Sequence, residues 1–213
     1  MFLQISEPTT LITDYLLGAL NLYLAARLWK TGKSKNIQSI KLWSGAFFAS
    51  ALAAVVGGTS HGFAFYLSEF ADSLIWKTTI YSIGLASFFM LAGTITATLT
   101  NPLKKWLLML TGIKFLLFAL WMMTHSAFKY VIYDYSPAMV GVMLLLIYAY
   151  LRKKEKGASY IITGILISFF AAGIQQAGLT IHKYFNHNDL YHIIQMGAMI
   201  FLYNGSRKLK DQR

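Results

Sequence analysis

Long apolar stretches separated by short polar segments dominate the chain. Seven of them approach the roughly 20 residues that an α-helix needs to cross a bilayer: 10–29, 42–66, 75–98, 103–124, 130–151, 158–181 and 190–205. No linker or change in composition divides them, so the pattern predicts one all-α domain, residues 1–213, folded as a seven-transmembrane-helix bundle. The first stretch lacks a preceding basic segment, so we interpret it as a retained helix rather than a signal peptide.

The composition agrees with a membrane protein. The chain is 56% hydrophobic and only 13% charged, whereas a soluble domain carries about 25% charged residues. The net charge of +11 would suggest a nucleic-acid partner in a soluble protein. In a membrane protein its meaning depends on which loops carry the basic residues. The chain has no cysteine, which excludes disulfides and thiolate metal sites.

The basic residues gather on one side of the predicted membrane. Fifteen of the 19 fall in alternate loops and the C-terminal tail: Arg27, Lys30, Lys33, Lys35, Lys41, Lys104, Lys105, Arg152, Lys153, Lys154, Lys156, Arg207, Lys208, Lys210 and Arg213. Lys77, Lys129 and Lys183 fall on the other side, and Lys114 lies inside the fourth stretch. The positive-inside rule therefore predicts an N-terminus outside and a cytoplasmic C-terminus. The positive charge then serves topology and anionic lipid contact, with no nucleic-acid partner.

The candidate chemistry lies on the outer side, where all the histidines fall: His61, His125, His182, His187 and His192. The glycine-rich segment 57–62 places His61 where helices approach closely. Segment 187–192 opens the last helix, with Asn188 as its expected N-cap and His192 one turn inside. Histidines near carboxylates suit zinc, whose bound water becomes a nucleophile near neutral pH. The alternative is a capped helix start with interfacial aromatic residues.

This layout resembles the CREST superfamily of seven-span proteins, which includes alkaline ceramidases and adiponectin receptors. His61 is similar to that family's span-two zinc ligand, Asp72 follows it at a similar spacing, and His192 is similar to a span-seven ligand. The resemblance implies zinc held by His61, His192 and His187. The family spaces its two span-seven histidines as H-x3-H, whereas His187 and His192 are spaced as H-x4-H. His182 could therefore replace His187.

In the same resemblance, Asp72 orients or deprotonates the zinc-bound water. The family serine position is Gly57 here, and Ser60 or Thr59 could replace that serine, with Ser60 the expected oxyanion-stabilising group. The implied function is a zinc-dependent hydrolase that acts on a membrane lipid amide or ester, similar to a ceramidase.

Other polar residues inside the predicted spans are further candidates. Asp14, Asp189 and Gln195 lie near the outer histidines, where they join the cluster or face interfacial water. Lys114 is a functional candidate, but it could also snorkel or pair with an acidic residue of the bundle. We expect a second set, Asn21, Gln175 and Gln176, to hydrogen-bond between helices, and Trp and Tyr near span ends to anchor the interface.

Several functions compete with the hydrolase. One is a metal- or pH-sensing receptor or transporter without turnover, since histidine titrates near neutrality; another is a membrane scaffold. Neither an inverted repeat nor a pair of broken helices is evident, which disfavours a typical secondary transporter. A retinal photoreceptor is excluded because stretch 190–205 has no lysine. Compact loops and the lack of cysteine favour a bacterial inner membrane, and the oligomeric state is not predicted.

Overall fold

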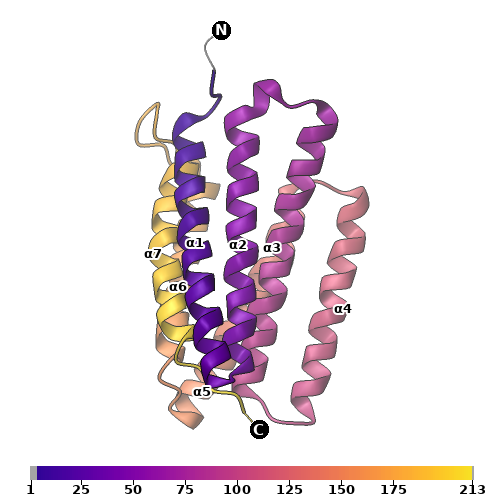
Figure 1. Cartoon of the computed structure of the whole chain (residues 1–213), viewed down its shortest axis with the longest axis vertical. Helices are drawn as coiled ribbons and strands as arrows, with labels where there is room; N and C mark the ends of the chain where they lie inside the picture. The colour runs from indigo at the N-terminus through magenta and orange to yellow at the C-terminus, as the bar shows by residue number, and fades with distance from the viewer. Residues whose placement is uncertain (1–3, 213) are drawn as a thin grey trace.

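The computed structural model describes residues 4–212, which form seven α-helices and one short 3-10 helix (Figure 1). The elements in chain order are α1 (Pro8–Lys35), α2 (Gln38–Phe63), η1 (Ala64–Tyr66), α3 (Glu69–Thr98), α4 (Leu103–Thr124), α5 (Phe128–Lys153), α6 (Ala158–Gln176) and α7 (His187–Ser206). The helices run alternately down and up, and we call the two ends of the bundle upper and lower as Figure 1 draws them. The N-terminus lies at the upper end and the C-terminus at the lower end.

Each predicted stretch overlaps one α-helix, and the boundaries differ by up to six residues: α1 continues to Lys35 and α3 already begins at Glu69. The sixth stretch was expected to reach residue 181, whereas α6 ends at Gln176. The chain turns there because Gly178 adopts a φ of +65°. Glycine adopts this conformation readily because it has no side chain. The seventh stretch was expected to begin at 190, whereas α7 begins at His187. The fifth stays helical through Pro137.

Five of the helices, α2 to α6, are long and apolar enough to cross a membrane. The chain is therefore a multi-pass integral membrane protein. α1 is 28 residues long and α7 is 20, but both are less apolar on average than the other five. Most of the polar residues of α7 lie in its first three turns.

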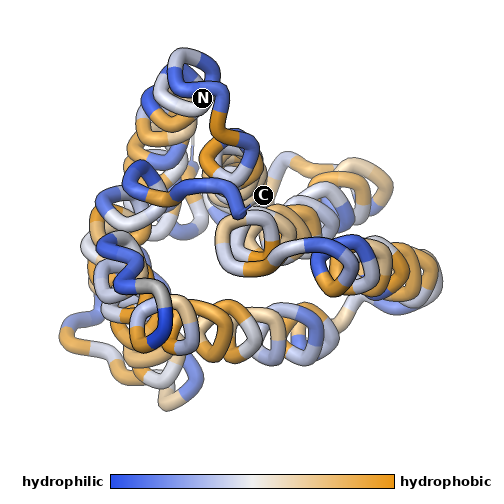
Figure 2. Tube along the Cα trace, turned by 90° about the horizontal axis from the view of Figure 1, so that it is seen from below, coloured by the Kyte–Doolittle hydropathy of each residue, from blue (hydrophilic) through white to orange (hydrophobic). Residues whose placement is uncertain are grey.

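Six helices form a ring, and α4 lies outside it. Around the ring, α1 contacts α2, α2 contacts α3, α3 contacts α5, α5 contacts α6, α6 contacts α7, and α7 returns to α1. Figure 2 views this arrangement along the helices from the lower end, and its most hydrophilic segments are the loops and the tail. α4 packs mainly on α3, through a small apolar cluster of Ile80, Phe118, Met122 and Val131. Most of α4 is exposed, which suits a helix that faces lipid.

A lysine of α3 fastens the upper end of α4. The Lys77 ammonium donates to the carbonyl oxygens of Met122 and of His125, the latter at 2.7 Å. These belong to the last turn of α4 and the residue after it, where carbonyls lack partners within the helix. A cation is also favourable at this end of the helix dipole.

The lower end of the ring is solidly packed. Its largest fully buried side chains include Leu28, Ile40, Leu146, Ile161 and Leu209, which belong to one continuous cluster. The C-terminal tail closes this end. The Asp211 carboxylate accepts the backbone N–H groups of Gln38 and Ser39, at 2.6 and 2.9 Å, at the start of α2. Space inside the protein therefore begins above this layer, at Trp43.

Candidate functional site

A cavity of about 480 Å³ lies inside the ring and extends from Trp43 and Leu202 near the lower end to His61 at the upper end. Residues from six helices line it, and none of them belongs to α4. Small side chains leave the space open: Ala46, Ala53, Ala54, Gly57, Ala86, Ala172 and Gly173 all face it. Its size lies within the range of about 300–1,000 Å³ that is typical of small-molecule sites.

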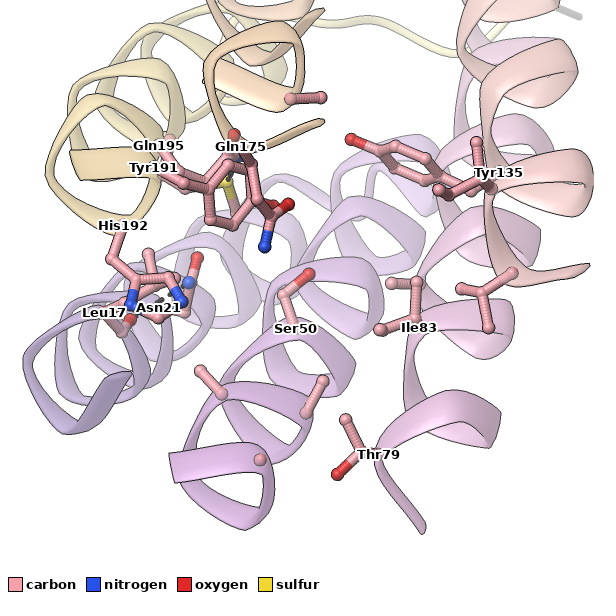
Figure 3. A pocket seen from close by; sticks show the side chains of 18 of the residues that line it. Leu17, Asn21, Ser50, Thr79, Ile83, Tyr135, Gln175, Tyr191, His192 and Gln195 are labelled. Atoms are coloured by element: carbon pink, nitrogen blue, oxygen red, sulfur yellow. Dashed lines mark hydrogen bonds between the residues drawn. The ribbon is translucent and has the colours of Figure 1, made fainter. Parts of the chain in front are cut away.

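The wall is mainly apolar, and its charge pattern is one-sided. Within the described part of the chain, the lining contains one carboxyl group, Asp14, and two imidazoles, His61 and His192. No lysine or arginine is among the lining residues. Figure 3 shows the α1–α7 side with Asn21, His192, Tyr191 and Gln195, and Tyr135 pointing in from the opposite side.

His192 joins α7 to α1 at the upper part of this wall. Its Nε2 lies 3.1 Å from Oδ1 of Asp14, and its Nδ1 lies 3.0 Å from the Thr13 hydroxyl. All three side chains are buried. A neutral ring fits this geometry, with Nε2–H donating to the carboxylate and Nδ1 accepting from the hydroxyl. Asp14 fits here because α2 has a glycine, Gly58, where a Cβ would lie only 2.6 Å from the Cβ of Asp14.

The start of α7 fixes the position of His192. Asn186, rather than the predicted Asn188, caps the helix: its side chain accepts from Asn188 N–H and Asp189 N–H, and Asp189 accepts from Asn186 N–H at 2.7 Å. This is a capping box with aspartate in place of the usual glutamate. Asn188 instead accepts from the Gln175 amide at 2.9 Å, so the prediction that Gln175 hydrogen-bonds between helices is confirmed.

The second predicted group lies at the end of α2. The His61 ring lies 3.4 Å from Glu7 at Nδ1, and it lines the upper end of the cavity. Ser60 donates to Asp72 at 2.9 Å, so the two residues predicted to act together do meet. Asp72 is exposed, however, and neither Ser60 nor Asp72 lines the cavity.

The other predicted ligands lie elsewhere. His187 is the first residue of α7, and His182 is exposed in the preceding loop against Tyr184. His125 stacks on Trp121 at the end of α4, with ring centroids 4.0 Å apart. Of the five histidines, only His61 and His192 line the cavity.

These residues do not fit a zinc centre as they lie. Across residues 4–212, no three His, Asp or Glu side chains form a group that could hold a metal ion. Both ring nitrogens of His192 face protein partners, whereas a ligand needs one free nitrogen. The zinc centre therefore stays a prediction.

Three buried polar atoms of the lining have no hydrogen-bond partner among the described residues. They are Oδ1 of Asn21, Oε1 of Gln195 and Nε1 of Trp43. Asn21 uses its amide N–H on its own helix, at Leu17 O, so the expected contact between helices is wrong. Unsatisfied buried polar atoms are costly, and they are usually paired with protein, water or ligand.

Lys114 lies outside the cavity. Its ammonium is 2.7 Å from Asp134 Oδ1 on α5 and donates to Ser87 of α3 at 2.9 Å. Of the roles considered for it, the structure supports pairing with an acidic residue of the bundle. The lysine thus fastens α4 to the ring.

Four aromatic residues of the lining were not expected there from the sequence: Trp76, Phe128, Tyr135 and Tyr191. Aromatic residues near span ends are expected as interface anchors, and helical spacing alone does not show which of them turn inward. Tyr191 carries the one usable signal, because it lies next to His192 in a helix that begins at His187.

Comparison with known proteins gives a family but no described activity. No curated protein and no solved structure matches the chain. The family described as "Family of unknown function (DUF6962)" matches residues 9–211, nearly the whole chain. The chain therefore belongs to this family.

Proposed function

We propose that the protein crosses the membrane seven times, with its N-terminus outside and its C-terminus in the cytoplasm. At 1.5 Å per residue, the 20 residues of α7 extend about 30 Å, enough for a hydrocarbon core, and α1 is longer. Their polar residues largely face the ring, including Asp14, Asn21, His192 and Gln195, all buried. The excess of lysine and arginine at the lower end gives the orientation.

In this membrane the protein binds a small lipid-like molecule in its cavity and acts as a receptor, without chemical turnover. The observation that carries this proposal is the cavity itself. Protein interiors contain few voids larger than a water molecule. Here about 480 Å³ of space extends along the inside of the ring, above the packed side chains of its lower end.

The lining supports a ligand that is mostly apolar with a polar end. Leu17, Phe47, Met90, Met139 and Phe169 supply apolar surface. Most of the polar lining groups, among them His61, His192 and Gln175, belong to the parts of their helices nearer the upper end. A receptor fits better than a carrier, because the helices lack the paired interruptions of typical transporters.

Tryptophan quenching tests the proposal. The exposed residues Trp29, Trp106 and Trp121 are replaced by phenylalanine, which leaves Trp43 and Trp76, both of which line the cavity. The protein is placed in nanodiscs of zwitterionic lipid and titrated with 11-bromoundecanol, whose bromine quenches nearby indole. We expect saturable quenching of the two remaining tryptophans.

A blocking variant makes the test specific. Ser50 points into the cavity in Figure 3, so Ser50→Phe fills part of it. The control is Ala19→Phe, which adds the same ring to an exposed position on α1. Quenching that saturates in the control and is lost in Ser50→Phe, at equal melting temperature, supports the proposal. Quenching that is linear, or equal in the two variants, overturns it.

The hydrolase is a second candidate, supported by the hydrogen bond between Ser60 and Asp72 near His61. It requires the histidines to regroup around zinc. Metal analysis of the purified protein tests it, with wild type compared with His192→Ala. Stoichiometric zinc that is lost in the variant, together with release of fatty acid from ceramide or N-acyl lipid, supports the CREST-like proposal. Negligible metal in both proteins removes it.

A further inference from the structure

The polar atoms of the α1–α7 side of the cavity are mainly acceptors. Asp14 contributes a carboxyl group, and Asn21 and Gln195 contribute buried amide oxygens without a partner among the described residues. Asn21 follows Asp14 by seven positions, two turns along the same face of α1, and Gln195 follows His192 by three. A ligand that donates hydrogen bonds or carries positive charge is therefore complementary to this wall.

The charges around this wall favour a cation over an anion. Two further carboxyl groups, Glu7 and Asp189, lie close enough to Asp14 to act on it electrostatically. The imidazoles of His61 and His192 are the basic groups of the lining. An anionic ligand would meet the carboxyl group without a lysine or arginine to bind it. Burying a charge without a partner costs several kcal/mol.

Aromatic rings complete a site for a cation. Tyr191 of α7, Tyr135 of α5, Trp76 of α3 and Phe128 of α5 line the cavity, and Trp76 and Phe128 pack with centroids 6.1 Å apart. Figure 3 shows Tyr135 and Tyr191 projecting into the cavity from different walls. The negative faces of aromatic rings attract organic cations, and quaternary ammonium groups are bound in this way.

We propose that the ligand is a cationic amphiphile, an organic ammonium group carried on an apolar chain. The ammonium lies between Asp14 and the aromatic residues, and the chain extends downward to Trp43. Ser44, the neighbour of Trp43, bonds to Ala25 O at 2.8 Å. Ala25 lies eleven residues below Asp14 on α1, or roughly 16 Å, which suits a chain of about undecyl length. This inference rests on the proposed function, because it assumes that the cavity holds a ligand.

Three brominated probes that differ only in their head group test it: (11-bromoundecyl)trimethylammonium, 11-bromoundecanol and 11-bromoundecanoic acid. Quenching is measured in zwitterionic nanodiscs with the same variant, which keeps only Trp43 and Trp76. We expect the ammonium probe to bind at least about tenfold more tightly than the acid. Equal or tighter binding of the acid overturns the inference.

Two variants assign that preference to the site. Asp14→Asn should reduce the preference for the ammonium probe over the acid to below about threefold. Tyr135→Leu should also weaken the ammonium probe, whereas Tyr133→Leu, an exposed neighbour on α5, should not. Melting temperatures identify a variant that fails to fold, and the tyrosine pair then decides.

The outcomes separate the two proposals. If none of the probes quenches, the cavity binds no such molecule, and the proposed function fails together with the inference. If the alcohol quenches saturably but the ammonium probe has no advantage, or if its advantage survives both Asp14→Asn and Tyr135→Leu, only the cationic ligand is wrong.

Discussion

The Nζ atom of Lys114 on α4 lies 2.7 Å from Oδ1 of Asp134 on α5, near the middle of a helix that is otherwise exposed. The Asp134 side chain is almost fully buried, and its Oδ2 has no partner among the described residues. Ser87 of α3 also accepts from the lysine. One ammonium therefore links the outlying helix to two members of the ring.

Removing this lysine should loosen α4. Lys114→Met leaves the Asp134 carboxylate buried without its cation, which costs about 3 kcal/mol. We expect a clearly lower melting temperature in detergent micelles. The double variant Lys114→Met/Asp134→Leu should recover most of the loss, because an apolar pair of similar volume replaces the charges. Lys105→Met, at an exposed position of the same helix, is the control. A single variant as stable as this control would show that the ion pair contributes nothing.

Two neighbouring glycines of α2 should respond differently to the same substitution. A Cβ at Gly58 would lie 2.6 Å from the Cβ of Asp14, whereas one at Gly57 meets Thr79 at an ordinary 3.5 Å. Gly58→Ala should therefore separate α1 from α2, at a cost of about 2 kcal/mol, and disturb the Asp14–His192 contact. Gly57→Ala should melt like wild type. Similar melting temperatures for the two variants would contradict the close approach at Gly58.

The sequence was sufficient for the helices because their apolar stretches are long. Five of the seven stretches are apolar enough to be recognised from composition, and the structure contains a helix in each of the seven. The end of α6 was missed because it depends on the positive φ of Gly178, which no hydrophobic pattern encodes. The position of α4 outside the ring could not be predicted, since every stretch resembles a lipid-facing one in sequence.

The site was only partly predictable, because a sequence specifies the residue types but not which side chains point into the bundle. His61, His192, Asp14 and Gln195 were expected near one another, and all of them line one cavity. His187 was grouped with them by the family resemblance, but the capping box of Asn186 makes it the first residue of α7.

The cap itself gives a third prediction. Asn186→Ala removes the acceptor for the first N–H groups of α7, which typically costs about 1 kcal/mol. His192 lies less than two turns beyond the cap, so probe binding should also weaken. Asn188→Ala removes the bond from Gln175 but leaves the cap in place, so it should affect stability less. The reverse order of melting temperatures would show that Asn188 is the cap after all.

Cysteine labelling in intact cells tests the number and direction of the membrane crossings. The chain has no cysteine, so each single substitution gives one label site. Gln4→Cys and Thr180→Cys lie at the upper end, and Ser34→Cys and Lys210→Cys at the lower end, all at exposed positions. A membrane-impermeant maleimide should label the upper pair directly and the lower pair only after permeabilisation. Gln4 precedes α1 and Ser34 lies in its last turn, and Thr180 and Lys210 flank α7, so each of these two pairs tests one of the two less apolar helices. If the two cysteines at the ends of α1, or the two at the ends of α7, were labelled from the same side, that helix would not cross the membrane.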